Sequence, residues 1–93
     1  MQCKNLNEVR MHIDKLDNEI VQKIAEREGY VVQAARFKKA SSEVKAERRV
    51  EEVIAAVREK AVSYGANQDL VEKIYRDMID GFIQLEMDTF KHQ

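Results

Sequence analysis

The 93-residue sequence contains no proline, no tryptophan, three glycines and one cysteine. Turns between strands depend on glycine and proline, so their scarcity excludes a turn-rich all-β architecture. The single cysteine, Cys3, excludes an intrachain disulfide, and without a CxxC motif or a Cys/His cluster along the sequence we expect no bound metal. No signal peptide opens the sequence, and no segment approaches the roughly 18 apolar residues that span a bilayer. We therefore expect a cytoplasmic protein that does not associate with membranes.

The composition is typical of one folded domain, residues 1–93. Charged residues make up 35% of the chain and hydrophobic residues 44%, a balance that favours a globular domain over a disordered one. Lys and Arg together number 16 against 17 for Asp and Glu, so the chain has no global field to attract nucleic acid. Any anionic ligand must be bound by particular cations.

The first predicted helix is unusually long. Asn5 is placed to cap it, and Glu8, three residues later, to close a capping box. Apolar residues then recur in steps of three and four until about Ser41, which predicts a helix of roughly 33 to 36 residues. Such a helix would be about 50 Å long, whereas a compact chain of this size has a radius of gyration of about 12 Å. We therefore expect a second copy of the chain to cover the overhang in an intertwined homodimer.

Two further helices complete a predicted all-α fold. The apolar pattern predicts one helix over about Val44–Tyr64, where Gly65 is placed for a left-handed C-cap. It predicts another from Asn67, a candidate N-cap, to about Phe90. Three helices and two short connections account for the whole chain.

Two cations interrupt the apolar stripe of the first helix. Arg27 and Lys38 fall within about 20° of the centre of this stripe, at positions where the pattern calls for Leu or Ile. They are 11 residues apart (27 to 38), or about 16 Å along the axis, so both side chains can reach one cavity. Buried cations require an anionic counterpart, either a carboxylate of another helix or a bound ligand. We favour a small anionic ligand because two such cations share one face.

Other charged residues flank the apolar faces. Arg10 lies about 80° from the stripe centre, so it can reach such a cavity only in a neighbouring subunit. Arg49 faces nearer to the apolar side of its helix than Arg48, which we expect to be solvated. Glu86 lies at the edge of the apolar sector of the third helix, one turn beyond Phe82, and is expected to be half-buried. Alone, each charge is more typical of a surface residue or a salt bridge at the rim.

Four stretches of the sequence carry a resemblance to a known family: VRMHIDKLDNEIVQKIAER, ARFK, ERRV and IDGFIQLEM. The most specific element is a set of three cations, Arg10, Arg27 and Lys38, at separations of 17 and 11 residues (10 to 27 and 27 to 38). On these residues the chain resembles, over nearly its whole length, the all-helical (type II) chorismate mutases and the related isochorismate pyruvate lyases.

The resemblance implies an intertwined homodimer with two sites, each completed by an Arg of the other chain. Four cations would surround the two carboxylates of a chorismate-like dicarboxylate: Arg27, Lys38 and Arg49 of one chain and Arg10 of its partner. Lys38 would also reach the ether oxygen of the substrate. Glu86 would face this oxygen from the other side, at a position where family members carry Gln or Glu.

The implied chemistry requires no nucleophile, metal or cofactor, and the sequence offers no usual catalytic set. Chorismate rearranges to prephenate in a pericyclic reaction, so the protein need only hold the compact conformer and stabilise the charge growing on the ether oxygen. The planar fork of Arg suits a carboxylate, and Lys suits a single oxygen. Glu86 can donate a hydrogen bond only when protonated, so we expect turnover to decline as the pH rises towards neutrality and above.

The sequence leaves three functions open. Ala46 and Val50 stand where typical mutases carry acidic residues that contact the substrate hydroxyl; these replacements and the aromatic Phe82 favour the lyase branch, which converts isochorismate to salicylate and pyruvate. Glu86, in place of the Gln of that branch, favours the mutase. We predict chorismate mutase activity, because a lyase-type site of this family can also support that reaction, with isochorismate pyruvate lyase as the alternative. A non-catalytic helical dimer is a third hypothesis, but such a module has no need of cations on an apolar stripe.

Overall fold

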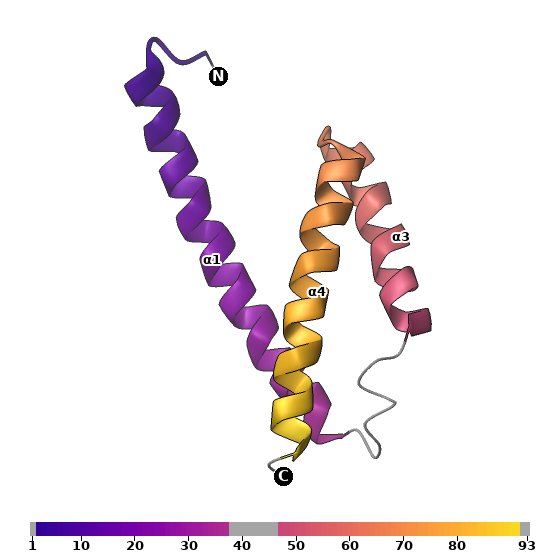
Figure 1. The fold of residues 1–93 in the computed structure, drawn as a ribbon. Coiled ribbons are helices and arrows are strands. Elements are labelled where there is room, and N and C mark those ends of the chain that lie inside the picture. The colour runs from indigo at the N-terminus through magenta and orange to yellow at the C-terminus, as the bar shows by residue number, and fades with distance from the viewer. Residues whose placement is uncertain (1, 38–46, 92–93) are drawn as a thin grey trace. The chain divides into compact units, whose positions relative to one another are not determined.

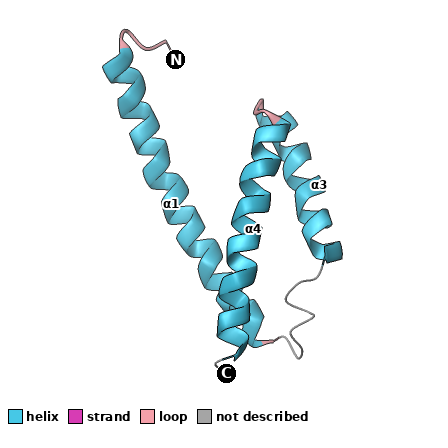
Figure 2. Cartoon of the chain, viewed as in Figure 1, coloured by secondary structure: helices cyan, strands magenta, loops and turns pink. Residues whose placement is uncertain are grey.

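A computed structural model describes residues 2–37 and 47–91 of the chain, and all the regular structure in these residues is helical (Figures 1 and 2). The helices are α1 (Leu6–Arg36), α3 (Glu47–Tyr64) and α4 (Gln68–Lys91). This arrangement confirms the predicted all-α fold. None of the described helices combines the length and the apolar character that crossing a bilayer requires.

The first helix is long, as predicted, with 31 residues. It ends at Arg36, where the N–H of Phe37 donates to the carbonyl of Ala34 at 3.0 Å. This bond spans three residues, as in the tightened last turn of many helices. The helix is therefore slightly shorter than the predicted 33 to 36 residues and ends before the predicted end near Ser41, because the chain turns at Phe37. The predicted start of the next helix at Val44 lies outside the described residues.

The two predicted N-caps, Asn5 of α1 and Asn67 of α4, both form the expected hydrogen bond. At α1, the N–H of Glu8 donates to Oδ1 of Asn5 at 2.9 Å. The Glu8 carboxylate accepts in return from the N–H of Lys4 at 3.3 Å, one residue earlier than in the standard capping box. At α4, the N–H of Leu70 donates to Oδ1 of Asn67 at 3.0 Å. Local sequence signals therefore define where these two helices begin.

The turn between α3 and α4 is a Schellman motif. The N–H of Ala66 donates to the carbonyl of Ala61 at 2.8 Å, and that of Gly65 to the carbonyl of Val62 at 3.1 Å. Gly65 has a φ of 74°, in the left-handed region that favours glycine. The predicted C-cap is therefore confirmed.

Two glycine substitutions are expected to change stability in opposite directions. A Cβ at Gly65 or Gly81 would meet nothing within 4 Å, so only backbone conformation distinguishes them. Gly65→Ala is expected to lower the free energy of unfolding by about 1 to 2 kcal/mol, because an L side chain is strained at positive φ. Gly81→Ala, inside α4, is expected to raise it by about 0.5 to 1 kcal/mol. Urea denaturation at one chain concentration measures both, and a Gly65→Ala variant as stable as the wild type would contradict the left-handed cap.

The chain divides into two compact units, Met1–Tyr30 and Val31–Gln93. In the second unit, α3 and α4 form an antiparallel helical hairpin (Figure 1). All the side chains that the structure describes as buried belong to this unit: Ala35 of α1; Ile54, Val57 and Ala61 of α3; and Ile79, Phe82 and Glu86 of α4. The core of the described chain therefore lies in the hairpin and the last turns of α1.

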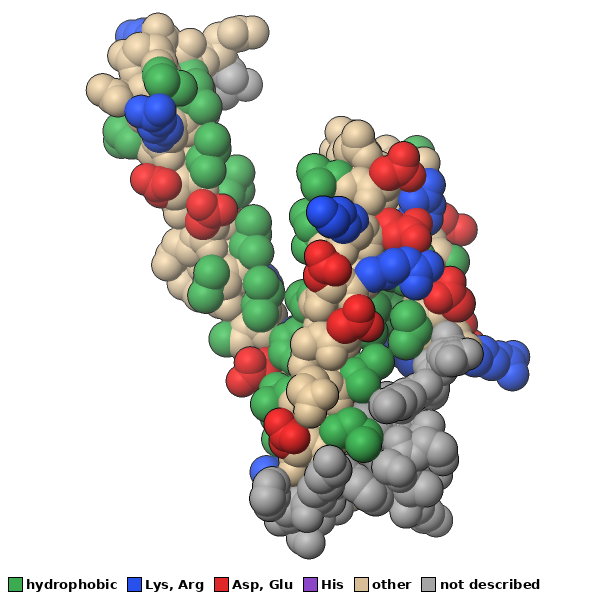
Figure 3. All heavy atoms as spheres, viewed as in Figure 1, with side chains coloured by type: hydrophobic (Ala, Val, Ile, Leu, Met, Phe, Trp, Pro, Cys, Tyr) green, Lys and Arg blue, Asp and Glu red, His purple; other side chains and the backbone are tan. Residues whose placement is uncertain are grey.

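The first unit consists of the N-terminal segment and most of α1, and its apolar stripe is exposed. The stripe keeps the predicted steps of three and four, and its members remain 37% to 59% exposed in the single chain: Leu6, Val9, Ile13, Leu16, Ile20 and Ile24. Apolar side chains follow the length of this helix in Figure 3. A helix with an exposed stripe of this length is typical of one that packs against another protein surface.

Candidate active site

Glu86 is buried on the apolar face of α4. It follows Ile79 and Phe82 in steps of three and four, so all three side chains lie on one face of the helix. Glu86 and Phe82 are each 9% exposed, and Oε2 of Glu86 is shielded from solvent. Glu86 is therefore more deeply buried than the half-burial predicted from its position at the edge of the apolar sector.

Arg27 is partly buried although it belongs to the otherwise exposed stripe of α1. Leu16 and Ile20 of that stripe are 54% and 53% exposed, whereas Arg27 is in the intermediate range and its Nη1 atom is shielded from solvent. Arg27 thus falls in the same intermediate range as Val31, four residues later, and is less exposed than the stripe residues before it. This burial agrees with the predicted direction of the Arg27 side chain.

The other predicted site residues differ in their surroundings. Arg10 is exposed on α1, and Val50 is partly buried, in register with the buried Ile54 of α3. The side chain of Arg49 is 73% exposed, with Nη1 4.0 Å from Oε2 of Glu52. Lys38 lies outside the described residues, as does Ala46.

The order of exposure of the neighbouring arginines agrees with the sequence pattern. Arg48 is 95% exposed, with Nε 3.6 Å from Oε1 of Glu52. Its predicted solvation is therefore confirmed, and Arg49 lies nearer to the apolar side, although it too faces solvent in the single chain.

The predicted site residues are divided between the two units of the chain. One unit contains Arg10 and Arg27, and the other contains Val50, Phe82 and Glu86. The convergence of the cations on one cavity therefore stays a prediction.

A network of ion pairs that the sequence did not predict joins α3 to α4. Arg76 binds Glu51 with both terminal nitrogens, at 3.0 and 3.1 Å, and its Nε donates to Glu72 at 2.7 Å. Arg58 Nη1 donates to Glu72 at 2.7 Å and to Asp69 at 3.1 Å. The spacing of four residues between Glu72 and Arg76 is a readable signal, but the bonds between helices depend on the register of the hairpin. Acidic and basic side chains gather over this face in Figure 3.

These bonds shift the ionisation of the acidic residues. The hydrogen bonds from Arg76 and then Arg58 lower the pKa of Glu72 from its ordinary value of 4.5. The hydrogen bond from Arg76 likewise lowers the pKa of Glu51. Both carboxylates therefore stay charged in the folded protein at a lower pH than in the unfolded chain.

The stability of the hairpin is accordingly expected to decline in acid. A carboxyl group whose pKa is lowered by folding stabilises the fold above its unfolded pKa and loses this contribution as the pH falls through its folded pKa. For Glu51 and Glu72 the loss begins near 4.5 and continues below it. Arg76→Gln removes the main cause of both shifts, so it should reduce the difference in thermal midpoint between neutral and acidic pH. Arg48→Gln, which changes an exposed arginine outside the network, is the control, and equal acid sensitivity in Arg76→Gln and wild type would contradict the assignment.

Comparison with known proteins identifies relatives over most of the chain. The sequence profile of the family described as chorismate mutase type II matches residues 9–87. The isochorismate pyruvate lyase of Pseudomonas aeruginosa is 31% identical over 81 residues, which cover 87% of this chain and 80% of that protein. Every predicted site residue, from Arg10 to Glu86, lies within the range matched by the family.

Proposed function

The chain belongs to the type II chorismate mutase family, and we propose that it catalyses the rearrangement of chorismate to prephenate. Within that family, the observation that carries the proposal is the partial burial of Arg27, with a shielded Nη1 atom, on the otherwise apolar stripe of α1. A guanidinium group in such a place suits the binding of a carboxylate, because its planar fork can bond to both oxygens. A helix that served only to pack against a partner would do so better with Leu or Ile at this position.

The proposed mechanism is electrostatic. Arg27, Lys38 and Arg49 of one chain, together with Arg10 of the partner, hold the two carboxylates of the substrate in the compact conformer. Lys38 and Glu86 face the ether oxygen, where negative charge grows as its bond to carbon breaks. Val50 and Phe82 supply apolar walls that exclude water and so strengthen these interactions. A single donor of this kind typically contributes a factor of about 100 to 1,000 to kcat.

We propose a homodimer in which the exposed stripe of α1 packs against a second copy of the chain. The support is the 37% to 59% exposure of its Leu, Ile and Val side chains, which a partner would cover. Arg10 is exposed on the same helix, within reach of a surface that packs there. Dimerisation would also explain how so short a chain encloses a dicarboxylate.

Isochorismate pyruvate lyase activity is the second candidate, and the relative from Pseudomonas aeruginosa favours it. The buried Phe82 and the partly buried Val50 are compatible with either substrate, because both reactions place charge on a similar ether oxygen. Incubating the purified chain separately with chorismate and with isochorismate distinguishes the two activities. Prephenate from chorismate supports the mutase, and salicylate with pyruvate from isochorismate supports the lyase. Turnover of neither substrate would refute both proposals.

Glu86→Gln is expected to change the pH profile of turnover. A carboxyl group donates a hydrogen bond to the ether oxygen only when protonated, whereas an amide donates at every pH. The variant should therefore be several-fold more active than the wild type above neutrality, with a flatter profile of kcat against pH. Glu59→Gln, a change at an exposed glutamate of α3, is the matched control. An unchanged profile in Glu86→Gln would remove Glu86 from the proposed mechanism.

A further inference from the structure

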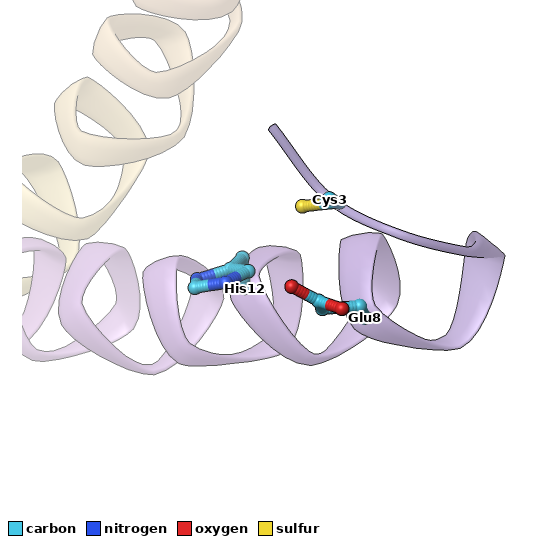
Figure 4. A group of neighbouring side chains, drawn as sticks. All are labelled: Cys3, Glu8 and His12. Atoms are coloured by element: carbon cyan, nitrogen blue, oxygen red, sulfur yellow. The ribbon is translucent and has the colours of Figure 1, made fainter. Parts of the chain in front are cut away.

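Three different metal-ligating groups meet at the beginning of α1. The segment that carries Cys3 lies over the first turns of the helix, beside the side chains of Glu8 and His12 (Figure 4). The Cys3 thiol, a Glu8 carboxylate oxygen and a His12 ring nitrogen all lie within 4.8 Å of one another. The spacing of the sequence did not predict this group, because the position of Cys3 depends on the path of the chain before the helix.

The backbone holds the three groups in place. Glu8 and His12 are four residues apart, so they lie on successive turns of one helix face. The N–H of Lys4, next to Cys3, donates to the Glu8 carboxylate at 3.3 Å and so ties the segment to the helix. A carboxylate oxygen that accepts such a bond keeps further lone pairs for a metal, and hydrogen-bonded carboxylates of this kind are common in metal sites.

The donor set selects a class of metal. Thiolate, imidazole and carboxylate together suit zinc and similar transition metals, whereas magnesium and calcium prefer oxygen ligands alone. Zinc bonds of about 2.0 to 2.3 Å place tetrahedral ligand atoms about 3.3 to 3.7 Å apart. Side-chain rotations that bring the ligand atoms about 1 to 1.5 Å closer together would therefore reduce the observed separations of up to 4.8 Å to these values. Three protein ligands leave a fourth position for water or another ligand.

The group is accessible and lies apart from the residues assigned to catalysis. Cys3 and Glu8 are partly buried, and His12 is exposed. Around the helix axis, His12 and Glu8 lie about 100° and 140° from Ile13 of the apolar stripe, on the opposite side from Arg10. A partner centred on the stripe would therefore face away from Glu8, whereas His12, about 60° from Val9, lies at the margin of the stripe.

We propose that Cys3, Glu8 and His12 bind one Zn²⁺ ion per chain at the N-terminal end of α1. This inference is independent of the proposed mutase or lyase activity, because that chemistry uses no metal. The bound ion would fasten the N-terminal segment to the helix and present an open coordination position to solvent.

Titration of the untagged, reduced and metal-free full chain with Co²⁺ tests the site. Cys3 is the chain's one cysteine, so any thiolate-to-cobalt charge-transfer absorption reports on it. We expect this absorption to saturate at one Co²⁺ per chain and to disappear when Zn²⁺ displaces the cobalt. Cys3→Ser should abolish it, and His12→Ala should weaken binding by at least about tenfold. Zn²⁺ should also raise the thermal midpoint of the wild type, because it binds the folded form.

Matched variants distinguish metal binding at this site from nonspecific metal binding elsewhere on the chain. Glu8→Gln removes a ligand and is expected to weaken binding, whereas Glu19→Gln, an exposed glutamate of the same helix, should not. His92→Gln, at the other histidine of the chain, should bind as the wild type does. His12 takes no part in the helix cap, so His12→Ala tests ligation even if Glu8→Gln loosens the helix start. Binding without thiolate absorption, equal binding by His12→Ala, or one metal per two chains would each overturn the proposal.

Discussion

The variants Arg10→Ala and Arg27→Ala should each be inactive alone, and we expect them to regain about one quarter of the wild-type activity when they are mixed and allowed to exchange subunits. The proposal assigns Arg27 to one chain of each site and Arg10 to the other. Random exchange makes about half of the dimers heterodimers, and each heterodimer contains one site with both arginines and one site with neither. Each unmixed variant has only defective sites. Turnover of the substrate by the mixture, compared with each variant alone, measures the recovery.

A second mixture provides the control for this experiment. Arg27 and Arg49 are assigned to the same chain of each site, so Arg27→Ala and Arg49→Ala together leave every site of a heterodimer with one defect. This mixture should show no recovery. Failure of the first mixture after demonstrated subunit exchange, or equal recovery in the second, would contradict the sharing of Arg10 between chains.

Arg27→Leu is expected to separate catalysis from folding. It should lower kcat/KM by a factor of about 100 to 1,000, because it removes a donor aimed at the substrate. Its cost in stability is expected to be smaller than its cost in activity, because a Leu side chain continues the apolar stripe that Arg27 interrupts. Nη1 of Arg27 is shielded from solvent, and the stripe residues that precede Arg27 on α1 are apolar.

The same variant distinguishes an enzyme from an interaction module. Arg48→Leu, at an arginine that is 95% exposed, is the control and should retain activity. Thermal denaturation and steady-state kinetics on the two variants measure the two properties separately. If Arg27→Leu were more stable and retained full turnover, Arg27 would have no role in substrate binding, and a purely structural function of α1 would be favoured.

Features that local sequence determines were predictable. Asn5 and Asn67 accept bonds from residues three positions later, and Gly65 supplies a left-handed residue, so the ends of these helices follow from a few neighbouring residues. The unusual length of α1 followed from uninterrupted periodicity.

Features that depend on tertiary register were not predictable. Arg76 and Glu51 are 25 residues apart, and nothing in their spacing indicates that the hairpin brings them together. The depth of Glu86 depends on what packs over the end of α4, so its angle on the helix gave only its direction. The approach of Cys3 to His12 depends on the path of the segment before α1. The sites of Lys38 and Ala46 lie outside the described residues, and their roles stay predictions.

The division of the chain into two units has a consequence for how it folds. The α3–α4 hairpin is held by contacts between residues close in sequence, such as Arg58 with Asp69 and Glu72, so it closes short loops and can form quickly at any dilution. In the proposed dimer, only a second chain covers the exposed apolar stripe of α1. The stability of this helix therefore depends on the concentration of the chain. Dilution would then loosen the helix that carries Arg10 and Arg27 before it affects the hairpin, and catalytic competence would depend on chain concentration more steeply than helical content does.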